Sequence, residues 1–545
     1  MRVQRLLRNK SRRKLLERLG QIGGPAAAYE GMSALGLLPV SAKAAPLSLP
    51  PDAARGQSVA ILGAGVGGLC AAYELDRAGY AVTVLESSER AGGRSLTLRR
   101  GDSFREMGDG PTQTCAFDPG AWLNAGPGRI PHHHTHVLDY CRRLNVVLQP
   151  YIFHSRSNYI HSATLGNEGG RIPARRVAYN LQGHVAELLD KCVSNGSLNE
   201  PLNGVDVKRL HEMLVKFGDL SPVSKDDASV EWKFRNQQGR AGYEVEPGLA
   251  AEPGVPLSPM SLDVLLRSDV WDDWVFRDAR YAWQATLMEP VGGMDMFWRG
   301  FMRQPLRRGS GTVADLVRYN ARVTGIETSA DKVTVAFTDA GAAATRTFDH
   351  CISTIPMTIF AGLKTNLDGR IMKAAASLPL VPSGKVGWQA ERFWETEDNI
   401  YGGISWESGG LEQMWYPSEG FLSAKGILTG VYVRGANAVA FNAKTVQERL
   451  QAARELAERL HPGQSGKLEH GVAIAWDRME HLRQGWSDHD HPDWKADATV
   501  LSAPQGRFYQ GGCQLTSWAG WQEGAVLAAQ EAIRTIDRQT RPGAN

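Results

Sequence analysis

The sequence predicts an α/β fold with a βαβ unit, a second sheet and a helical insertion, and three observations lead to this prediction. Apolar β-branched runs at residues 59–62 and 81–85 flank a helical segment, which indicates a βαβ unit. Residues 385–433 alternate apolar and polar side chains, as in a sheet with one buried face. Between these regions, Val137, Cys141 and Leu144 show helical spacing, and we expect residues 126–289 to be a mostly helical insertion.

Composition is that of a globular protein and excludes several function classes. The chain has 545 residues, 42% of them hydrophobic, which suits two to four domains. Its net charge of +3 is small, and after the first twenty residues no block of Lys and Arg predicts nucleic-acid binding. Six cysteines without C-x-x-C spacing predict buried thiols. No apolar run reaches the ~18 residues of a membrane span, so we expect no transmembrane segment.

Residues 1–56 form a basic N-terminal segment with two interpretations of equal weight. Residues 11–16, SRRKLL, resemble a twin-arginine export signal, and residues 42–44, AKA, offer a cleavage site. Against this, Tyr29 and Glu30 interrupt the intervening stretch, and residues 26–37 have the apolar rhythm of a packed helix. Localisation is open between the cytoplasm and export.

The turn after the first predicted strand carries a dinucleotide-binding pattern. Gly63, Gly65 and Gly68 have G-x-G-x-x-G spacing, which permits a tight turn, approach of the backbone to a pyrophosphate, and close helix packing. The helix they open presents free N–H groups to phosphates. Glu86 ends the second strand, where an acid binds a ribose hydroxyl. This order of features predicts a bound dinucleotide.

The residues after Glu86 narrow that cofactor to FAD. Arg90, Gly92, Gly93 and Arg94 follow it, and the Arg94 guanidinium can pair with a pyrophosphate. Here the chain resembles the flavin-dependent amine oxidase family, in which E-x-x-x-R-x-G-G-R marks FAD binding. The resemblance implies a Rossmann-like FAD-binding domain of the amine oxidase type, a mixed-sheet substrate domain and the helical insertion. The expected FAD-binding segments are 57–125, 290–375 and 496–545, and the substrate-binding domain is 376–495.

Strand signals return after the insertion. Residues 321–328 and 332–338 are predicted to pair as a hairpin, and residues 348–355 and 507–512 as further strands. In the family, the residue at Val323 lies beside the adenine.

The C-terminal residues 517–533, SWAGWQEGAVLAAQEAI, resemble the terminal FAD motif of the family. There a helix N-terminus points at the flavin with an aromatic residue beside the ring, which implies cofactor contacts for Trp521 and Gln522. Many relatives have Gly-Glu where this chain has Gly512 and Cys513, so the glycine is kept and the acid is absent.

Cys513 also suggests the cysteine that links flavin covalently in monoamine oxidases. That cysteine precedes the last strand, however, and the corresponding residues here are Gly485 and Trp486. We therefore expect noncovalent FAD.

The substrate class depends mainly on residues 126–131, GPGRIP, which resemble the G-P-x-R-x-P segment of L-amino acid oxidases. There the arginine holds the substrate carboxylate, which assigns that role to Arg129 and places Gly128 and Arg129 beside the cofactor. A guanidinium offers a planar fork to a carboxylate, and an amine substrate would leave it unpaired at roughly 1–3 kcal/mol or more. The alternative is that Arg129 caps or salt-bridges the next helix.

Four further side chains complete the expected site. Tyr416 in MWYP resembles the second tyrosine of an I-Y-Y-P segment, which donates to the carboxylate. Lys385, before RFWE, matches the lysine that holds a water near flavin N5. Trp486 and Trp521 are expected to form an aromatic wall for the substrate.

The histidines at 132, 133, 134 and 136 invite a metal interpretation, because residues 132 and 136 share a helix face. No H-E-x-x-H pattern is present, and we expect solvated or pocket-lining histidines and no metal.

The resemblance implies FAD-dependent oxidative deamination of L-amino acids to 2-oxo acids, with dioxygen consumed and ammonia and hydrogen peroxide released. Alternatives are a flavin amino-acid monooxygenase of the tryptophan 2-monooxygenase type, an amine oxidase, and an idle flavoprotein scaffold. A homodimer is compatible with the sequence. The sequence does not specify which amino-acid side chain the substrate carries.

Overall fold

The computed structural model describes residues 47, 49–50, 53–54, 56–108, 110–168, 170–197, 202–226, 229–271 and 275–541. The chain divides into two compact units, residues 1–48 and 49–545, and every described helix and strand lies in the second. Both interpretations of the N-terminal segment rest on residues 11–44, which lie outside the described residues.

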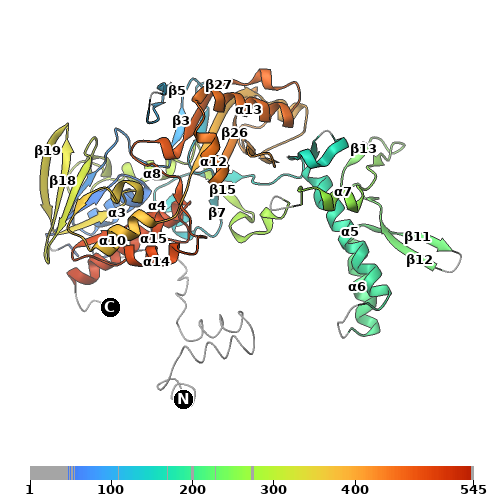
Figure 1. The fold of residues 1–545 in the computed structure, drawn as a ribbon, viewed down its shortest axis with the longest axis horizontal. Helices are drawn as coiled ribbons and strands as arrows, with labels where there is room; N and C mark the ends of the chain where they lie inside the picture. The colour runs from blue at the N-terminus through green and yellow to red at the C-terminus, as the bar shows by residue number, and fades with distance from the viewer. Residues whose placement is uncertain are drawn as a thin grey trace, which may run out of the picture. The chain divides into compact units, whose positions relative to one another are not determined.

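A five-stranded parallel sheet forms the centre of the FAD-binding domain (Figure 1). Its order is β16 (Val317–Arg318), β2 (Ala81–Leu85), β1 (Ser58–Leu62), β20 (His350–Ser353) and β29 (Phe508–Gln510). The strands come from three separated parts of the chain, so the predicted Rossmann-like assembly is confirmed. The central strand β1 is apolar and buried from residue 59 onward, as is usual in parallel sheets.

Helices α3 (Val66–Arg77) and α15 (Gln522–Thr540) pack against each other beside this sheet. Two glycines make the tight entry into α3 possible. Gly63 has a φ of +103°, and a Cβ on Gly68 would lie 1.9 Å from the carbonyl oxygen of Gly63. Glu523 in the first turn of α15 accepts a hydrogen bond from the backbone N–H of Val137 (2.8 Å), which caps α4 (Thr135–Arg143).

A four-stranded sheet completes this domain, in the order β19 (Ala342–Phe348), β18 (Val333–Asp339), β17 (Val323–Thr328) and β21 (Lys364–Thr365). The predicted hairpin is confirmed as β17 and β18, which pair antiparallel. The domain also contains α8 (Met296–Met302), α9 (Met357–Phe360), α10 (Gly369–Ser377) and α14 (Trp494–Leu501).

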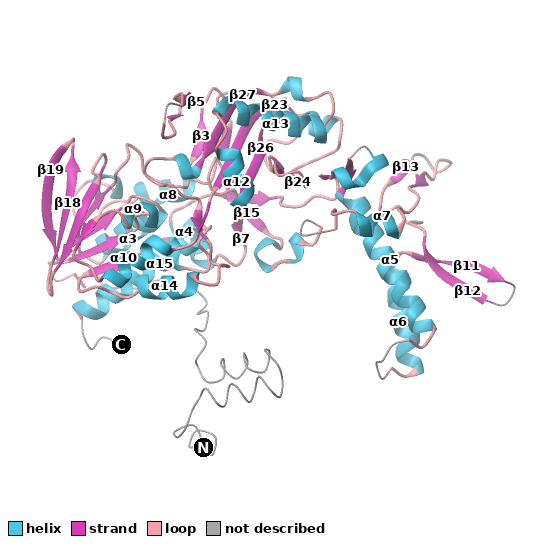
Figure 2. Ribbon diagram, viewed as in Figure 1, coloured by secondary structure: helices cyan, strands magenta, loops and turns pink. Residues whose placement is uncertain are grey.

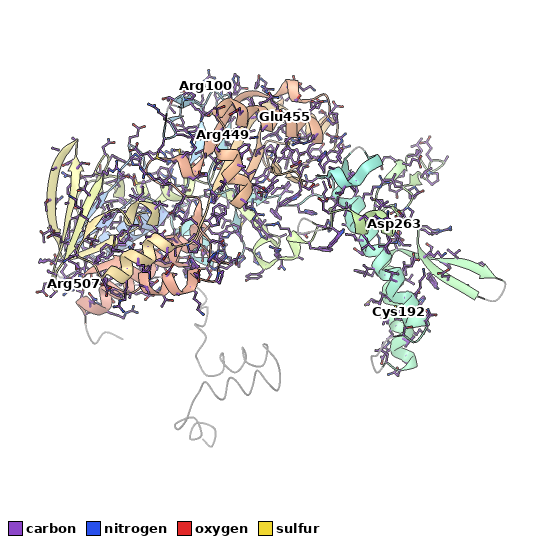
Figure 3. All side chains as sticks on the ribbon, in the orientation of Figure 1. Arg100, Cys192, Asp263, Arg449, Glu455 and Arg507 are labelled. Atoms are coloured by element: carbon purple, nitrogen blue, oxygen red, sulfur yellow. The ribbon has the colours of Figure 1, made fainter. Side chains whose placement is uncertain are left out.

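A seven-stranded mixed sheet forms the second domain. Its order is β10 (Arg171–Pro173), β9 (Tyr159–His161), β24 (Gly403–Glu407), β25 (Glu412–Tyr416), β26 (Lys425–Arg434), β23 (Ser383–Glu391) and β27 (Glu469–Ala475). Helices α12 (Gly435–Asn442) and α13 (Val446–Leu460) pack on it, while α11 (Phe393–Thr396) follows β23. Arg449 on α13, labelled in Figure 3, forms a buried bidentate ion pair with Glu106.

The segment 126–289 is less helical than the sequence predicts. Helices α5 (Ala174–Ser194) and α6 (Gly204–Gly218) lie side by side, with the hairpin β11 (Leu220–Asp226) and β12 (Ser229–Phe234) beside α5 (Figure 2). The same segment also holds α7 (Leu262–Arg267) and contributes β9 and β10 to the mixed sheet. A separate three-stranded sheet has the order β7 (Ile130–Pro131), β15 (Leu287–Pro290) and β8 (Leu148–Tyr151). Strands β7 to β10 and β15 have two to four residues, too few to show an alternating pattern.

Short antiparallel pairs connect these parts: β3 (Thr97–Arg99) with β6 (Trp122–Asn124), β4 (Ser103–Phe104) with β5 (Gln113–Thr114), β13 (Tyr243–Val245) with β14 (Val255–Pro256), and β22 (Leu380–Val381) with β28 (Trp486–Ser487). All six cysteines are free thiols; Cys192 on α5, labelled in Figure 3, is exposed and the others are buried. Across the described residues, no helix combines the length and apolarity needed to cross a bilayer.

Candidate active site

A cavity of about 470 Å³ lies where the parallel-sheet domain meets the mixed sheet. This volume is in the range of small-molecule and cofactor sites. It brings together most of the predicted cofactor residues, which come from all three segments of the FAD-binding domain. The predicted residues in its lining are Gly63, Gly65, Glu86, Gly93, Arg94, Val323, Lys385, Trp486, Gly512, Cys513, Trp521 and Gln522.

The glycine-rich turn leaves space for a pyrophosphate. A Cβ on Gly65 would meet no protein atom within 4 Å, because this residue faces the cavity, and one on Gly93 would lie 3.6 Å from the Gly65 Cα. Gly68 serves packing instead, through its contact with Gly63. The turn and the start of α3 thus fit a phosphate group approached by backbone N–H groups.

Glu86 is fixed at the end of β2 by hydrogen bonds to both carboxylate oxygens. Its Oε2 accepts from the backbone N–H of Ala64 (2.7 Å), and its Oε1 accepts from the backbone N–H of Ser88 (2.9 Å). The carboxylate is therefore oriented before any ligand binds, at the position where an acid receives ribose hydroxyls.

Arg94 joins two distant segments across the cavity. Its Nη1 donates to the carbonyl oxygen of Gly485 (2.6 Å), and its Nη2 contacts the Cys513 Sγ at 3.0 Å. The Cys513 thiol is thus engaged by the arginine. Gly485 and Trp486, which the sequence analysis aligned with the covalent cysteine of monoamine oxidases, both line the cavity.

Gln522 begins α15, and its Nε2 donates to the Ser95 Oγ (2.7 Å). The Trp521 ring lies 4.9 Å from the His134 ring and 5.2 Å from the Trp283 ring, measured between centroids. The helix N-terminus and its aromatic neighbour therefore line the cavity as the terminal FAD motif requires.

Arg129 does not line this cavity but lies in an aromatic cage next to it. Its guanidinium carbon is 4.2 Å from the ring centroid of Trp283, 4.8 Å from Trp415 and 5.0 Å from Phe153. It is 6.0 Å from Trp521, which does line the cavity. Rings attract a cation but accept no strong hydrogen bond.

The charge of Arg129 is consequently poorly compensated. The side chain is 7% exposed, and its Nε and Nη1 find no hydrogen-bond partner among the described residues. Burial lowers the pKa of Arg129, although the Tyr151 and Tyr432 hydroxyls favour the charged form. Buried N–H groups of a guanidinium without partners are costly, and a carboxylate would satisfy them. Among the described residues, the N-terminus of α4 is capped by Glu523 and not by Arg129.

Gly128 lies outside the cofactor cavity and has a packing role. A Cβ at this position would come within 2.6 Å of the Trp415 ring. The glycine therefore lets the backbone that carries Arg129 approach the mixed sheet.

Tyr416 is a correction to the sequence prediction, because it faces the other side of the mixed sheet. Its hydroxyl is 2.7 Å from the Ser405 Oγ and 2.7 Å from the His461 Nε2, in the core under α13. Side chains alternate along a strand, so its neighbour Trp415 is the one that faces Arg129. A direct bond from Tyr416 to a carboxylate held by Arg129 is incompatible with this placement.

The tyrosine that lines the cavity is Tyr432 on β26, which the sequence did not single out. It pairs across strands with Lys385, and its ring centroid lies 4.9 Å from that of Trp415. The alternation of β26 was the available signal, because Val431 and Val433 are core residues and Tyr432 must point the opposite way.

Lys385 is buried between the two domains. Its Nζ donates to the carbonyl oxygens of Asn124 (2.8 Å) and Gly126 (2.6 Å) and lies 4.2 Å from the centre of the Trp415 ring. Burial, and then the charge of Arg129, lower the pKa of Lys385 well below its usual value. A lysine held in this way favours the neutral amine, which can hold a water or accept a proton.

The histidine cluster borders the aromatic cage. His134 is buried between the Trp518 and Trp521 rings, and burial lowers its pKa to about 3, so it is neutral. His136 instead contacts Glu523 through its Nδ1 at 2.7 Å. Among the described residues no group of His, Cys, Asp or Glu is arranged to hold a metal ion.

A second, smaller cavity of about 40 Å³ lies behind the cage, lined by Glu289, Glu419, Tyr151 and Trp415 among others. Burial first, and then the neighbouring carboxyl of Glu419, raise the pKa of Glu289 to about 8. The pair therefore holds a proton at neutral pH.

Comparison with known proteins places this site in a family. The profile of a family described as flavin containing amine oxidoreductase matches residues 66–536. The flavin-dependent L-tryptophan oxidase RebO of Lentzea aerocolonigenes is 25% identical over 503 residues, which cover 88% of this chain and 98% of that protein. An L-amino-acid oxidase of Protobothrops flavoviridis is 24% identical over 504 residues, with 88% of each chain covered.

Solved structures show the same fold at lower identity. A putrescine oxidase bound to putrescine superposes with a TM-score of 0.56 at 18% identity, covering 88% of this chain and 99% of its own. A cyclohexylamine oxidase from Brevibacterium oxydans superposes with a TM-score of 0.56 at 17% identity, covering 89% of this chain and 99% of its own.

Proposed function

We propose that this protein, which belongs to the flavin-containing amine oxidoreductases, is an oxidase of L-amino acids. Its cofactor is FAD, and its class is that of FAD-dependent oxidoreductases. The overall reaction would be L-amino acid + O₂ + H₂O → 2-oxo acid + NH₃ + H₂O₂. When bound, FAD would supply the two-electron redox chemistry that links the substrate to dioxygen.

One observation carries the choice of amino acids over amines: the caged guanidinium of Arg129, whose buried Nε and Nη1 find no partner among the described residues. An α-carboxylate supplies two acceptor oxygens in the geometry of the guanidinium fork. An amine without a carboxylate would leave these N–H groups unsatisfied. The names of the L-amino-acid oxidase relatives agree with this choice.

The other residues of the site would orient the substrate and handle protons. The rings of Trp415, Trp521 and Trp283 exclude water from Arg129 and so strengthen its pairing with the carboxylate. The Tyr432 hydroxyl, which favours the charged form of the same guanidinium, would donate to that carboxylate in the role the sequence assigned to Tyr416. Lys385, whose pKa is lowered, would accept a proton or hold the water that hydrolyses the imino acid.

The test is a peroxide-coupled screen of the twenty L-amino acids, with D-enantiomers as controls and anaerobic flavin bleaching as a second readout. We expect peroxide, ammonia and a 2-oxo acid from at least one L-amino acid and none from its D-enantiomer. An amide with carbon dioxide would assign a monooxygenase instead. Turnover of amines alone would assign an amine oxidase, and an unbleached flavin with every substrate would indicate a non-catalytic scaffold.

A further inference from the structure

The hydrogen-bonding groups of Arg129 are closed off in this structure. Its Nε and Nη1 are buried, so a carboxylate can reach them only if a neighbouring ring moves. The guanidinium carbon lies 4.2 Å from the ring centroid of Trp283 and 6.0 Å from that of Trp521, which immediately precedes α15 and lines the cofactor cavity. The two indole rings are 5.2 Å apart, so Trp283 contacts both Arg129 and the wall of the cavity. Opening the cage toward the cofactor therefore involves Trp283 or a ring beside it.

Trp283 is held less firmly than its neighbours in the cage. Trp415 lies on β25, between β24 and β26 in the mixed sheet, and its indole N–H donates to the Gln413 Oε1 (2.8 Å). Phe153 is 6% exposed and belongs to a buried cluster. Trp283 is partly exposed and belongs to the three-residue 3₁₀ turn η3 (Tyr281–Trp283), which is part of no sheet. A short, partly exposed turn can move at a lower cost in free energy than a central strand.

Trp283 is carried by residues 281–286, which we call the strap. Every residue of the strap is at least partly exposed, and the strap ends where β15 begins. At its outer end, the Tyr281 ring lies 4.4 Å from the His133 ring, although Tyr281 is 60% exposed. At its inner end, the Trp283 ring stacks on Phe153 with 4.8 Å between centroids. Ring contacts of this kind hold the strap at both ends and are weak enough to break and re-form.

A substrate carboxylate competes with the Trp283 ring for Arg129. In the closed strap, the ring covers the guanidinium and compensates part of its charge. Once the ring moves aside, the Arg129 N–H groups can form charge-assisted hydrogen bonds with a carboxylate, which are stronger than the attraction of the ring. The ring can then return over the ion pair and exclude water from it.

We propose that the strap is a gate, in which Trp283 must leave Arg129 before a substrate carboxylate can bind there and closes over the ion pair afterwards. Tyr281 is the latch that holds the strap from outside. This inference rests on the proposed function, since it assumes that Arg129 binds the α-carboxylate.

The gate is tested by rapid mixing of the holoenzyme with pentanoate, which carries a carboxylate but no amine to oxidise. Its association and dissociation rate constants are measured from the change in flavin absorbance. Because a closed gate lowers the population that can bind, Trp283→Ala should raise the association rate constant by about tenfold or more. The dissociation rate constant should rise as well, because no ring closes over the ion pair.

The latch is tested separately. Tyr281→Ala should raise the association rate constant by about threefold or more, as expected for the loss of one aromatic pair, whereas Tyr281→Phe keeps the ring and should match the wild type. Trp271→Ala is the matched control for the loss of an indole, because Trp271 is 41% exposed, and it should change neither rate constant. FAD content and Tm establish that each variant is folded. An unchanged association rate constant in Tyr281→Ala would refute the latch.

The outcomes distinguish the gate from the function. An association rate constant that is unchanged or lowered in Trp283→Ala would overturn the gate while leaving the oxidase function intact. A wild type that does not bind pentanoate, or an Arg129→Met variant that binds it equally well, would instead remove the carboxylate site on which the proposed function depends.

Discussion

Replacing Arg129 by Met tests the link between its caged guanidinium and the substrate carboxylate. Met fills a similar volume between the rings of Trp283 and Trp415 and removes the charge and the N–H donors. In the wild type, two of these nitrogens are buried and lack partners among the described residues. They are the donors that a substrate carboxylate would use.

The expected loss follows from those two nitrogens. A hydrogen bond to a charged group contributes about 1.5–3 kcal/mol, so two contribute about 3–6 kcal/mol. At about 1.4 kcal/mol per factor of ten, kcat/KM for an L-amino acid should fall by about 10²–10⁴. Because Arg129 would hold a group that does not react, most of the loss should appear in KM.

The folded protein should tolerate this change. The variant loses attraction between the cation and the rings, of about 2 kcal/mol or more per desolvated contact. It also no longer buries an uncompensated cation, which in the wild type is destabilising by several kcal/mol. Since these effects oppose each other, we expect Tm to change by only a few degrees.

The assay compares each L-amino acid with the amine obtained by removing its carboxylate. Steady-state peroxide formation is measured for both substrates in the wild type and in Arg129→Met, with FAD content as the control. The variant should lose activity toward the amino acid and leave the amine rate unchanged. An unchanged KM for the amino acid would refute the role given to Arg129.

Four further variants probe the cofactor site and the buried titratable groups. Gly65→Val should keep the far-UV circular dichroism of the wild type but should not retain FAD in gel filtration, because its side chain meets no protein atom and fills the space for the pyrophosphate. Gly68→Ala should instead lower the yield of folded protein, since its Cβ would lie 1.9 Å from the carbonyl oxygen of Gly63. Burial lowers the pKa of Lys385, so this lysine binds its proton more tightly in the unfolded chain than in the folded protein. The stability of the wild type relative to Lys385→Met should therefore fall as pH drops below about 10.4, by up to about 1.4 kcal/mol per pH unit. Denaturant titrations between about pH 7 and pH 10 measure this slope, and a difference that does not vary with pH would contradict the lowered pKa. The pKa of Glu289 is raised to about 8, so the carboxyl contributes fully to the free energy of unfolding below its unfolded pKa of about 4.3 and loses this contribution as pH rises toward 8. Glu289→Gln should therefore flatten the fall in Tm over that range. Parallel Tm curves for the two proteins would show that the carboxyl titrates normally.

The determinants of the predicted cofactor site are local in the sequence. The turn at Gly63 and Gly65, the acid Glu86 and the start of α15 each depend on a few consecutive residues. They line the cavity in the structure. The three-segment assembly was predicted from the family resemblance, and in the structure β20 pairs in parallel with both β1 and β29.

The substrate side of the site is harder to predict because it depends on strand facing and on irregular segments. Tyr416 matches a motif by position, yet a shift of one residue along β25 exchanges the faces of the sheet, and Trp415 turns toward Arg129 instead. Trp283 and Arg277 come from a stretch of short turns with no periodicity, which gives no signal of burial. Their contacts become visible only when β15 and β24 bring the cage together.

The separation of the FAD-binding segments along the chain also sets the order in which the site can form during synthesis. The glycine turn at Gly65 and the acid Glu86 leave the ribosome early, but the strand β29 and the start of α15, which close the cavity, lie more than 400 residues later. At about 5–20 residues per second, the first βαβ unit waits tens of seconds for its last wall. Its apolar strand β1 lacks the neighbour β20 for most of that interval. The complete cofactor site can therefore form only after β29 and the start of α15 have been synthesised.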